Sequence, residues 1–196
     1  MQRRRFIAMT GAMLASSGLS LTGCTTTGPS GSGSPAANAG RRATIDADVD
    51  ATLTRLYSTV NGSRELVGNA RGVLVFPSVI SAGFWIGGQY GQGSLRVGGQ
   101  TTGYYSVAAA SFGLQIGAQS KAIVMLFMTQ EALDKFTGSQ GWAAGVDATV
   151  AVVRVGANGN MDTSTATSPV EAFVLTNAGL MAGVSLEGTK ISRLII

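Results

Sequence analysis

Few residues in this chain of 196 residues can do covalent chemistry. The sequence has one cysteine, Cys24, and no histidine. A thiol can be alkylated, but a single cysteine cannot form a disulfide within its own chain. The lack of histidine removes the commonest general base and a common zinc ligand. The ten acidic residues are scattered without a recognisable motif. We therefore expect a protein that is not an enzyme and that holds no cofactor and no metal.

The segment in front of Cys24 indicates a use for that thiol. Three arginines at residues 3–5 precede an apolar stretch over residues 6–21, which is too short to span a bilayer as a helix. A basic start, a short apolar middle and small residues at the end are typical of a secretory signal. The last four residues, Leu-Thr-Gly-Cys, resemble the bacterial lipobox. That resemblance implies that lipid is attached to Cys24 and that the chain is cut just before it.

The same region suggests how the chain is organised and where it goes. Residues 3–7 resemble a twin-arginine export signal, but a plain basic start is almost the same in sequence, so both export routes stay open. Residues 25–40 carry no charge and no bulky apolar group, and such a segment cannot bury enough surface to fold. We expect a signal peptide over 1–23, a lipidated flexible tether over 24–42 and one domain over 43–196. The lipid would hold the domain at a bacterial outer membrane, facing the periplasm or the cell surface.

The net charge excludes one class of partner. Three of the 14 basic residues precede Cys24, which leaves 11 Lys and Arg against ten Asp and Glu in the rest of the chain. A nucleic-acid-binding domain carries a strongly basic patch or stripe. We therefore expect no nucleic-acid partner.

The domain should begin with a helix over residues 43–60. Apolar residues recur there at helical spacing and form one stripe, which consists of Ile45, Val49, Leu53, Leu56, Tyr57 and Val60. Thr44 is the expected N-cap. Asp46, Asp48 and Asp50 would then lie in the early turns, where the helix dipole favours negative charge. Further short helices are predicted over residues 63–69 and over residues 130–136, the latter capped by Thr129.

Short apolar segments after residue 71 predict strands. They cover residues 72–76, stopped by Pro77, and then 104–117, 122–128, 146–155, 170–175 and 180–186, with a turn at 158–160. Residues 83–97 are predicted to form a glycine-interrupted hairpin region. A helix followed by strands predicts an α+β fold, with an amphipathic helix packed on a mainly antiparallel, glycine-rich sheet or barrel-like body. The glycines of residues 87–93 do not match a nucleotide-binding motif. Close backbone packing explains them better.

Arginines near the amino end of the domain are the candidate binding residues. Arg55, Arg64 and Arg71 could each meet the phosphate of a lipid head group, because a guanidinium binds two oxygens at once. Acidic residues in the same stretch nearly cancel this charge, so an ordinary solvated surface is the alternative.

Several stretches of the chain resemble the SYLF-domain family. They are residues 70–77 (ARGVLVFP), 82–84 (AGF), 86–88 (IGG), 111–119 (SFGLQIGAQ) and 177–188 (NAGLMAGVSLEG). The resemblance implies a phospholipid-binding domain that acts through basic residues and an amino-terminal amphipathic helix. Ser81 stands where many members carry a lysine. The actin association of eukaryotic members is not carried over, because an exported bacterial domain would meet no actin.

Two functions follow as alternatives. The first is a lipoprotein with a non-catalytic domain that binds membrane phospholipid. The second is a structural or envelope-maintenance lipoprotein that acts through another envelope protein.

Overall fold

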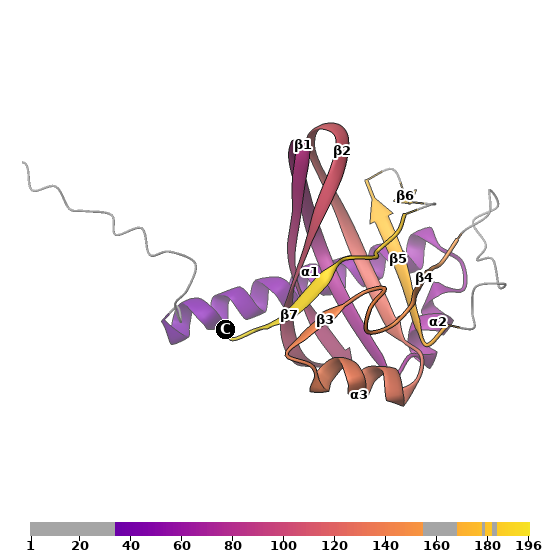
Figure 1. The fold of residues 1–196 in the computed structure, drawn as a ribbon. Helices are drawn as coiled ribbons and strands as arrows, with labels where there is room; N and C mark the ends of the chain where they lie inside the picture. Colours follow the sequence, from indigo (N-terminus) through magenta and orange to yellow (C-terminus); the bar gives the residue numbers. More distant parts are fainter. Residues whose placement is uncertain (1–33, 155–167, 178, 182–183) are drawn as a thin grey trace, which may run out of the picture. The chain divides into compact units, whose positions relative to one another are not determined.

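The computed structural model describes residues 34–154, 168–177, 179–181 and 184–196, so the turn expected at 158–160 lies outside it. Three helices and seven strands make up these residues (Figure 1). In chain order they are α1 (Pro35–Thr59), α2 (Ser63–Asn69), β1 (Gly72–Val97), β2 (Gln100–Phe127), α3 (Gln130–Gly138), β3 (Gly141–Ala143), β4 (Val150–Val152), β5 (Val170–Thr176), β6 (Gly179–Leu180) and β7 (Lys190–Leu194). The fold is α+β, as expected.

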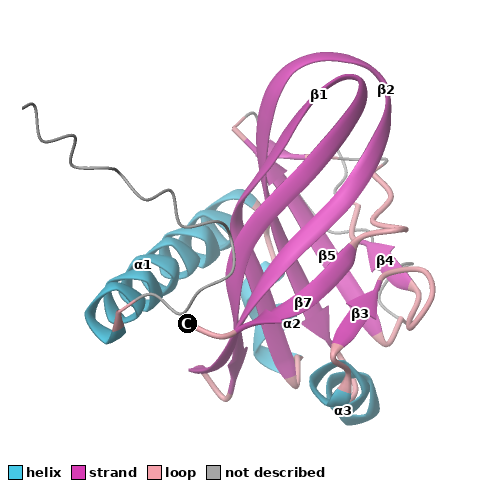
Figure 2. Ribbon diagram, turned by 60° about the vertical axis from the view of Figure 1, so that its left-hand side comes forward, coloured by secondary structure: helices cyan, strands magenta, loops and turns pink. Residues whose placement is uncertain are grey.

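Two long strands, β1 and β2, form most of the sheet. They pair antiparallel along almost their whole length and are joined at Gly98 and Gly99, whose φ angles of 59° and 82° suit glycine in a two-residue turn. Each strand curves over near its middle (Figure 2). The prediction that Pro77 ends a strand is wrong. β1 continues past Pro77 through a register irregularity, where a missing N–H is tolerated.

The remaining strands extend one curled, mainly antiparallel sheet (Figure 2). Its order is β3-β7-β2-β5-β4, with β1 also pairing β2 and β6 pairing β5, and only β4 runs parallel to its neighbour. β5 confirms the strand predicted over 170–175. The strand predicted over 146–155 starts too early, because Asp147 Oδ2 accepts a hydrogen bond from the Ala143 backbone N–H at 2.6 Å and closes a turn. The strand predicted over 180–186 is also too long, since β6 ends at Leu180.

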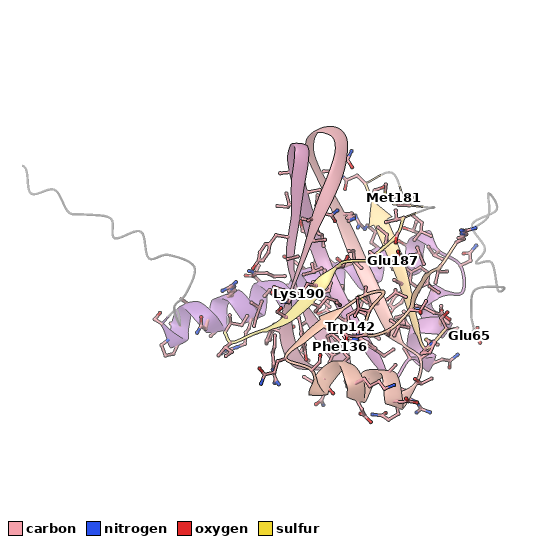
Figure 3. The ribbon with its side chains drawn as sticks, viewed as in Figure 1. Glu65, Phe136, Trp142, Met181, Glu187 and Lys190 are labelled. Atoms are coloured by element: carbon pink, nitrogen blue, oxygen red, sulfur yellow. The ribbon has the colours of Figure 1, made fainter. Side chains whose placement is uncertain are left out.

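The sheet has an apolar core on each of its two faces. α3 covers the first core, in which Phe127, Phe136 and Trp142 pack together, with 5.8 Å between the ring centroids of Phe136 and Trp142 (Figure 3). Thr129 caps α3 as predicted, because its side chain accepts a hydrogen bond from the Ala132 N–H at 3.2 Å. α1 and α2 cover the second core, on the opposite side of the sheet from α3 (Figure 2).

α1 starts earlier than the sequence indicates. It begins at Pro35, with Ser34 as its N-cap, so the prediction of Thr44 as N-cap is wrong and residues 35–42 are helical. Proline suits the first turn of a helix, where its missing N–H costs nothing. The buried residues of α1 are Ile45, Val49, Thr52 and Leu56.

Because of the early start, the three aspartates lie in the middle of α1, and the first turn contains no acidic residue. Two of them attach the helix to the β1–β2 hairpin instead. Asp46 accepts hydrogen bonds from Thr101 Oγ1 at 2.9 Å and from Tyr104 Oη at 2.7 Å, and Asp50 pairs with Arg96 at 2.5 Å. Burial, and then the hydrogen bond to Asp46, raise the pKa of Tyr104 to about 12, so its phenol stays protonated and can donate.

The first half of β1 lies directly against its own second half. A Cβ atom on Gly93 would overlap the Val75 carbonyl oxygen, and one on Gly91 would come within 2.7 Å of the Ser78 carbonyl oxygen. Only glycine allows two backbones to approach so closely. These glycines come from the 87–93 cluster and therefore serve close packing, as expected.

One carboxylate in the described chain is buried in the strand β5. Glu171 on β5 is 1% exposed, and neither of its carboxylate oxygens has a hydrogen-bond partner among the described residues. Burial raises the pKa of this side chain.

The crossing of β1 makes a direct prediction for stability. Gly93→Ala should lower the free energy of unfolding by roughly 1–3 kcal/mol or more, because the new methyl group has no room beside Val75. Gly88→Ala on the same strand is the matched control, since nothing lies within 4 Å of its would-be Cβ, and it should change stability by no more than about 0.5 kcal/mol. Urea unfolding of both variants tests this. Equal stabilities would contradict the close crossing.

Glu171 makes a second prediction, on the pH dependence of stability. A raised pKa means that the folded state binds the proton more tightly than the unfolded state. Stability should therefore fall as pH rises from the ordinary carboxyl range through the raised pKa. Glu171→Leu should remove this component and raise the free energy of unfolding at pH 8 by roughly 1–3 kcal/mol.

Glu171→Gln separates charge from shape, because it removes the titration but leaves a buried polar group. Urea unfolding between pH 4 and pH 8 measures all three proteins. An identical pH dependence in the wild type and both variants would show that Glu171 is not buried as a charge.

Candidate functional site

The predicted site residues are distributed over separate parts of the chain. Cys24 lies outside the described residues. Arg55 is half-buried on α1, and its Nε has no hydrogen-bond partner among the described residues. Arg71 is exposed just before β1, where its backbone N–H donates to the Phe127 carbonyl at 2.8 Å. Arg64 is exposed on α2, and its guanidinium carbon lies 4.4 Å from the centroid of the Tyr57 ring.

Arg64 therefore lies beside a crevice that Tyr57 helps to line. This crevice has a volume of about 640 Å³ and lies between α1, α2 and the β1–β2 turn. Its apolar wall consists of Leu53, Tyr57, Val67, Ala70 and Val73. Its polar side carries Asp50 and Arg96, next to Gly98 and Gly99 of the turn.

Each part of the crevice has a local cause. Tyr57 and Leu53 lie on the flank of the apolar stripe of α1, so they are half-buried and leave one side free. Gly62, with a φ of 82°, reverses the chain between α1 and α2, which brings Arg64 of α2 back over the Tyr57 ring. A cation above an aromatic face is attracted by the ring's quadrupole. The contact therefore holds the guanidinium at this position.

Two guanidinium groups act on the phenol of Tyr57. Burial raises the pKa of the Tyr57 phenol, while the positive charges of Arg64 and Arg96 oppose that rise. The charge of Arg96 is compensated by Asp50, and its Nη2 also donates to the Asp46 carbonyl at 3.3 Å. Arg64 has no carboxylate partner among the described residues. Arg64 is therefore a cation without a carboxylate partner in the described chain, in contact with the lining residue Tyr57.

This arrangement suits an amphiphilic anion better than a reacting substrate. The apolar wall can take hydrocarbon, and Arg64 can bind a phosphate or carboxylate through two charge-assisted hydrogen bonds. Asp50, the carboxylate lining the crevice, is already paired with Arg96, which leaves it poorly placed to act as a general base.

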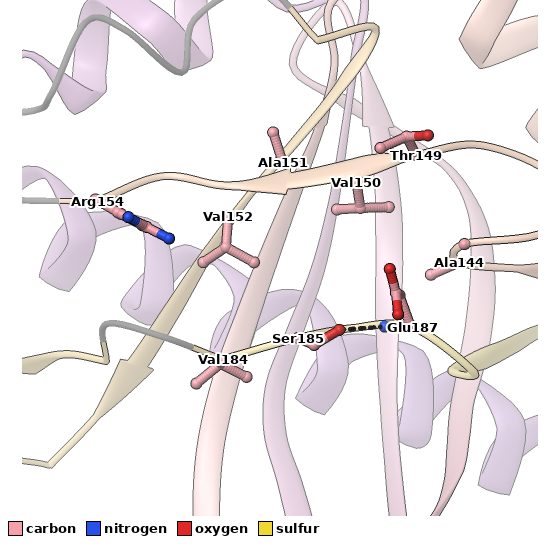
Figure 4. A pocket seen from close by; sticks show the side chains of 10 residues that line it. Ala144, Thr149, Val150, Ala151, Val152, Arg154, Val184, Ser185 and Glu187 are labelled. Carbon is pink, nitrogen blue, oxygen red and sulfur yellow. Dashed lines mark hydrogen bonds between the residues drawn. The ribbon is translucent and has the colours of Figure 1, made fainter.

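A second hollow of about 380 Å³ lies between β4 and residues 184–187. Val150, Val152 and Val184 form its apolar middle, with Arg154 at one end and Glu187 at the other (Figure 4). Both charged side chains are exposed, as ordinary surface charges are.

The sequence indicated Arg64 as a candidate residue but gave no sign that Tyr57 and Arg96 belong to the same site. Tyr57 was assigned to the apolar stripe, and Arg96 sits within a strand. The contact between Asp50 and Arg96 spans 46 residues and leaves no local pattern, so only the fold shows it.

The described helices include none that is both long and apolar enough to cross a membrane. Residues 108–194 match a protein-family model described as Ysc84, "Las17-binding protein actin regulator". No curated protein matches the chain. The matched range runs from β2 to β7 and contains the 111–119 and 177–188 stretches, whereas the crevice residues precede it. The resemblance seen in the sequence is therefore confirmed for residues 108–194, which match the SYLF (Ysc84) domain family.

Proposed function

We propose that this chain is an outer-membrane lipoprotein whose non-catalytic SYLF domain binds phospholipid in the crevice between α1, α2 and the β1–β2 turn. The observation that carries the proposal is Arg64, an exposed cation held on the Tyr57 ring at the edge of an apolar crevice. The phosphate would lie against Arg64, and hydrocarbon would lie along Leu53, Val67 and Val73. Anchoring rests on Cys24 and on the export signal in front of it.

The family match supports the proposal indirectly. The matched family is described by binding to Las17 and by regulation of actin. An exported domain would meet neither, so the shared property that suits this chain is the association of the family with lipid.

Lipid attachment at Cys24 predicts a mass change in one peptide. After expression of the full chain in a bacterium, the tryptic peptide that begins at Cys24 should carry the mass of diacylglycerol and further acyl groups. Cys24→Ala should abolish both the cleavage and the added mass, because sulfur is the atom that is alkylated. Mass spectrometry of the membrane fraction measures this. An unmodified chain that still begins at Met1 would contradict the anchor.

Lipid binding by the domain predicts charge selectivity. The chain from residue 24 onward, with Cys24→Ser to remove the anchor, should float with phosphatidylglycerol-containing vesicles. Arg64→Glu should weaken this binding roughly tenfold or more, since a charge-assisted hydrogen bond contributes about 1.5–3 kcal/mol. Arg193→Glu is the matched control, because it makes the same charge change at an exposed position on β7.

Two results would contradict the proposal. No flotation with either anionic or zwitterionic vesicles would remove lipid binding and favour an envelope protein as the partner. Equal losses of vesicle binding in the Arg64 and Arg193 variants would show that the effect comes from overall charge and that the crevice has no role.

A further inference from the structure

A third hollow combines exposed apolar side chains with an arginine. Among the described residues, Ile80 and Tyr90 are bulky apolar side chains that remain 54% and 51% exposed. Both line a hollow of about 400 Å³ between α1 and the place where β1 crosses itself. Single exposed apolar residues are normal on a protein surface. Two exposed apolar side chains that line the same hollow are better explained by a binding surface.

The tyrosine in this hollow is held in place. Gln92 Nε2 donates to Tyr90 Oη at 2.8 Å, and Arg41 Nε donates to Gln92 Oε1 at 3.1 Å. This chain of hydrogen bonds joins α1 to the second half of β1 and fixes an aromatic ring on the surface. A ring that is already fixed loses little conformational entropy when it binds.

The chemistry of the hollow matches the interface between water and hydrocarbon. Tyrosine prefers that interface because its ring is apolar and its hydroxyl is polar. Ile80 can enter the hydrocarbon, and Arg41 can meet phosphate. The neighbouring charges are Asp48, which lines the hollow, and Arg42, which donates to the Ile196 carbonyl at 2.7 Å. Arg41 offsets Asp48 within the hollow and Arg42 is already bound to Ile196, so Arg41 is the cation that can meet phosphate at an anionic membrane surface.

The position of the hollow along the chain indicates that its occupant is the membrane. Nine residues lie between Cys24 and Ser34, the N-cap of α1, and the ten steps from Cys24 to Ser34 can span at most about 35 Å. The α1 residues of the hollow, Arg41 to Asp48, come next, about 10–20 Å further along the helix. The opposite end of α1, beside the Arg64 crevice, is about 37 Å from its start, since the helix has 25 residues. An acylated Cys24 would therefore bring the hollow to the bilayer before it brings the crevice there.

We infer that the surface formed by Ile80, Tyr90 and Arg41 is the face on which the domain docks to the phospholipid bilayer that holds its own anchor. This inference rests on the proposed acylation of Cys24. It is independent of lipid binding in the crevice, because the two surfaces share no residue.

The test uses the acylated full-length lipoprotein, in which acylation blocks the only native thiol. Ile80→Cys and Tyr90→Cys each provide a single site for a fluorescent label that senses polarity. Val146→Cys is the control, since Val146 is 81% exposed but lies between β3 and β4. The labelled proteins are reconstituted into phosphatidylethanolamine–phosphatidylglycerol vesicles with brominated acyl chains, which quench fluorophores within the hydrocarbon.

The docking face predicts at least twofold stronger quenching at residues 80 and 90 than at residue 146. Equal quenching at all three positions, or quenching at residue 146 alone, would overturn it. In a further outcome, the label at residue 80 changes its emission as the density of protein in the vesicles rises, without being quenched. That result would show a second copy of the protein as the occupant and would also overturn the docking face. Intact mass reports acylation separately, and the Arg64 flotation assay reports the crevice. Failure of docking is thus distinct from failure of the proposed function.

Discussion

The fold depends on the contact of β1 with itself. Where Gly93 passes over Val75 and Gly91 passes over Ser78, two backbones lie closer than any side chain would allow. This contact lets one strand contribute twice to the same sheet. It curls the sheet and brings the β1–β2 turn back beside the helices. Arg96 and Tyr104, which flank that turn, can then bind the aspartates of α1. The position of α1, and therefore the crevice, follows from a close approach made by two glycines.

Once the sheet is curled, its two faces are closed by different means. Aromatic packing with α3 closes one face, and it involves Tyr105, Phe127, Phe136 and Trp142. The aliphatic stripe of α1 closes the other face, together with the hydrogen bonds of Asp46 and the ion pair of Asp50. The polar contacts fix the rotation of α1 about its axis. They leave Leu53 and Tyr57 beside the crevice and place Arg41 and Asp48 beside the hollow at the other end.

Local sequence patterns predicted the elements that have local causes. α2, α3 with its Thr129 cap, and β5 lie where spacing and capping residues indicated. The start of α1 was missed because a Pro- and Ala-containing segment was read as an extension of the uncharged tether. The hairpin predicted over residues 83–97 is wrong, because these residues belong to the single strand β1. β1 and β2 are longer than predicted because Pro77 and the glycines interrupt their apolar runs in the sequence. β7 was missed because Arg193 and Lys190 break its alternation, and its pairing with β2 is non-local.

The candidate site likewise has one residue that the sequence indicates and contacts that only the fold shows. The sequence alone identifies Arg64 as a candidate, since it is one of several arginines in the first 30 residues of the predicted domain. Its stacking on Tyr57 depends on the reversal at Gly62, and the ion pair of Arg96 with Asp50 depends on the whole hairpin. The burial of Glu171 could not be predicted from the sequence either. An acidic residue in an apolar strand is expected to face solvent until the helices that cover the strand are known.

The proposed phospholipid site lies between α1, α2 and the β1–β2 turn. Hydrogen–deuterium exchange of the Cys24→Ser chain, with and without phosphatidylglycerol vesicles, tests it most directly, because each amide reports its own protection. Phospholipid in the crevice should slow exchange in α2 and in the turn at Gly98 and Gly99 when vesicles are present, with little change in α3 on the opposite face. Unchanged exchange around the crevice, together with protection confined to α3 or β3, would contradict it.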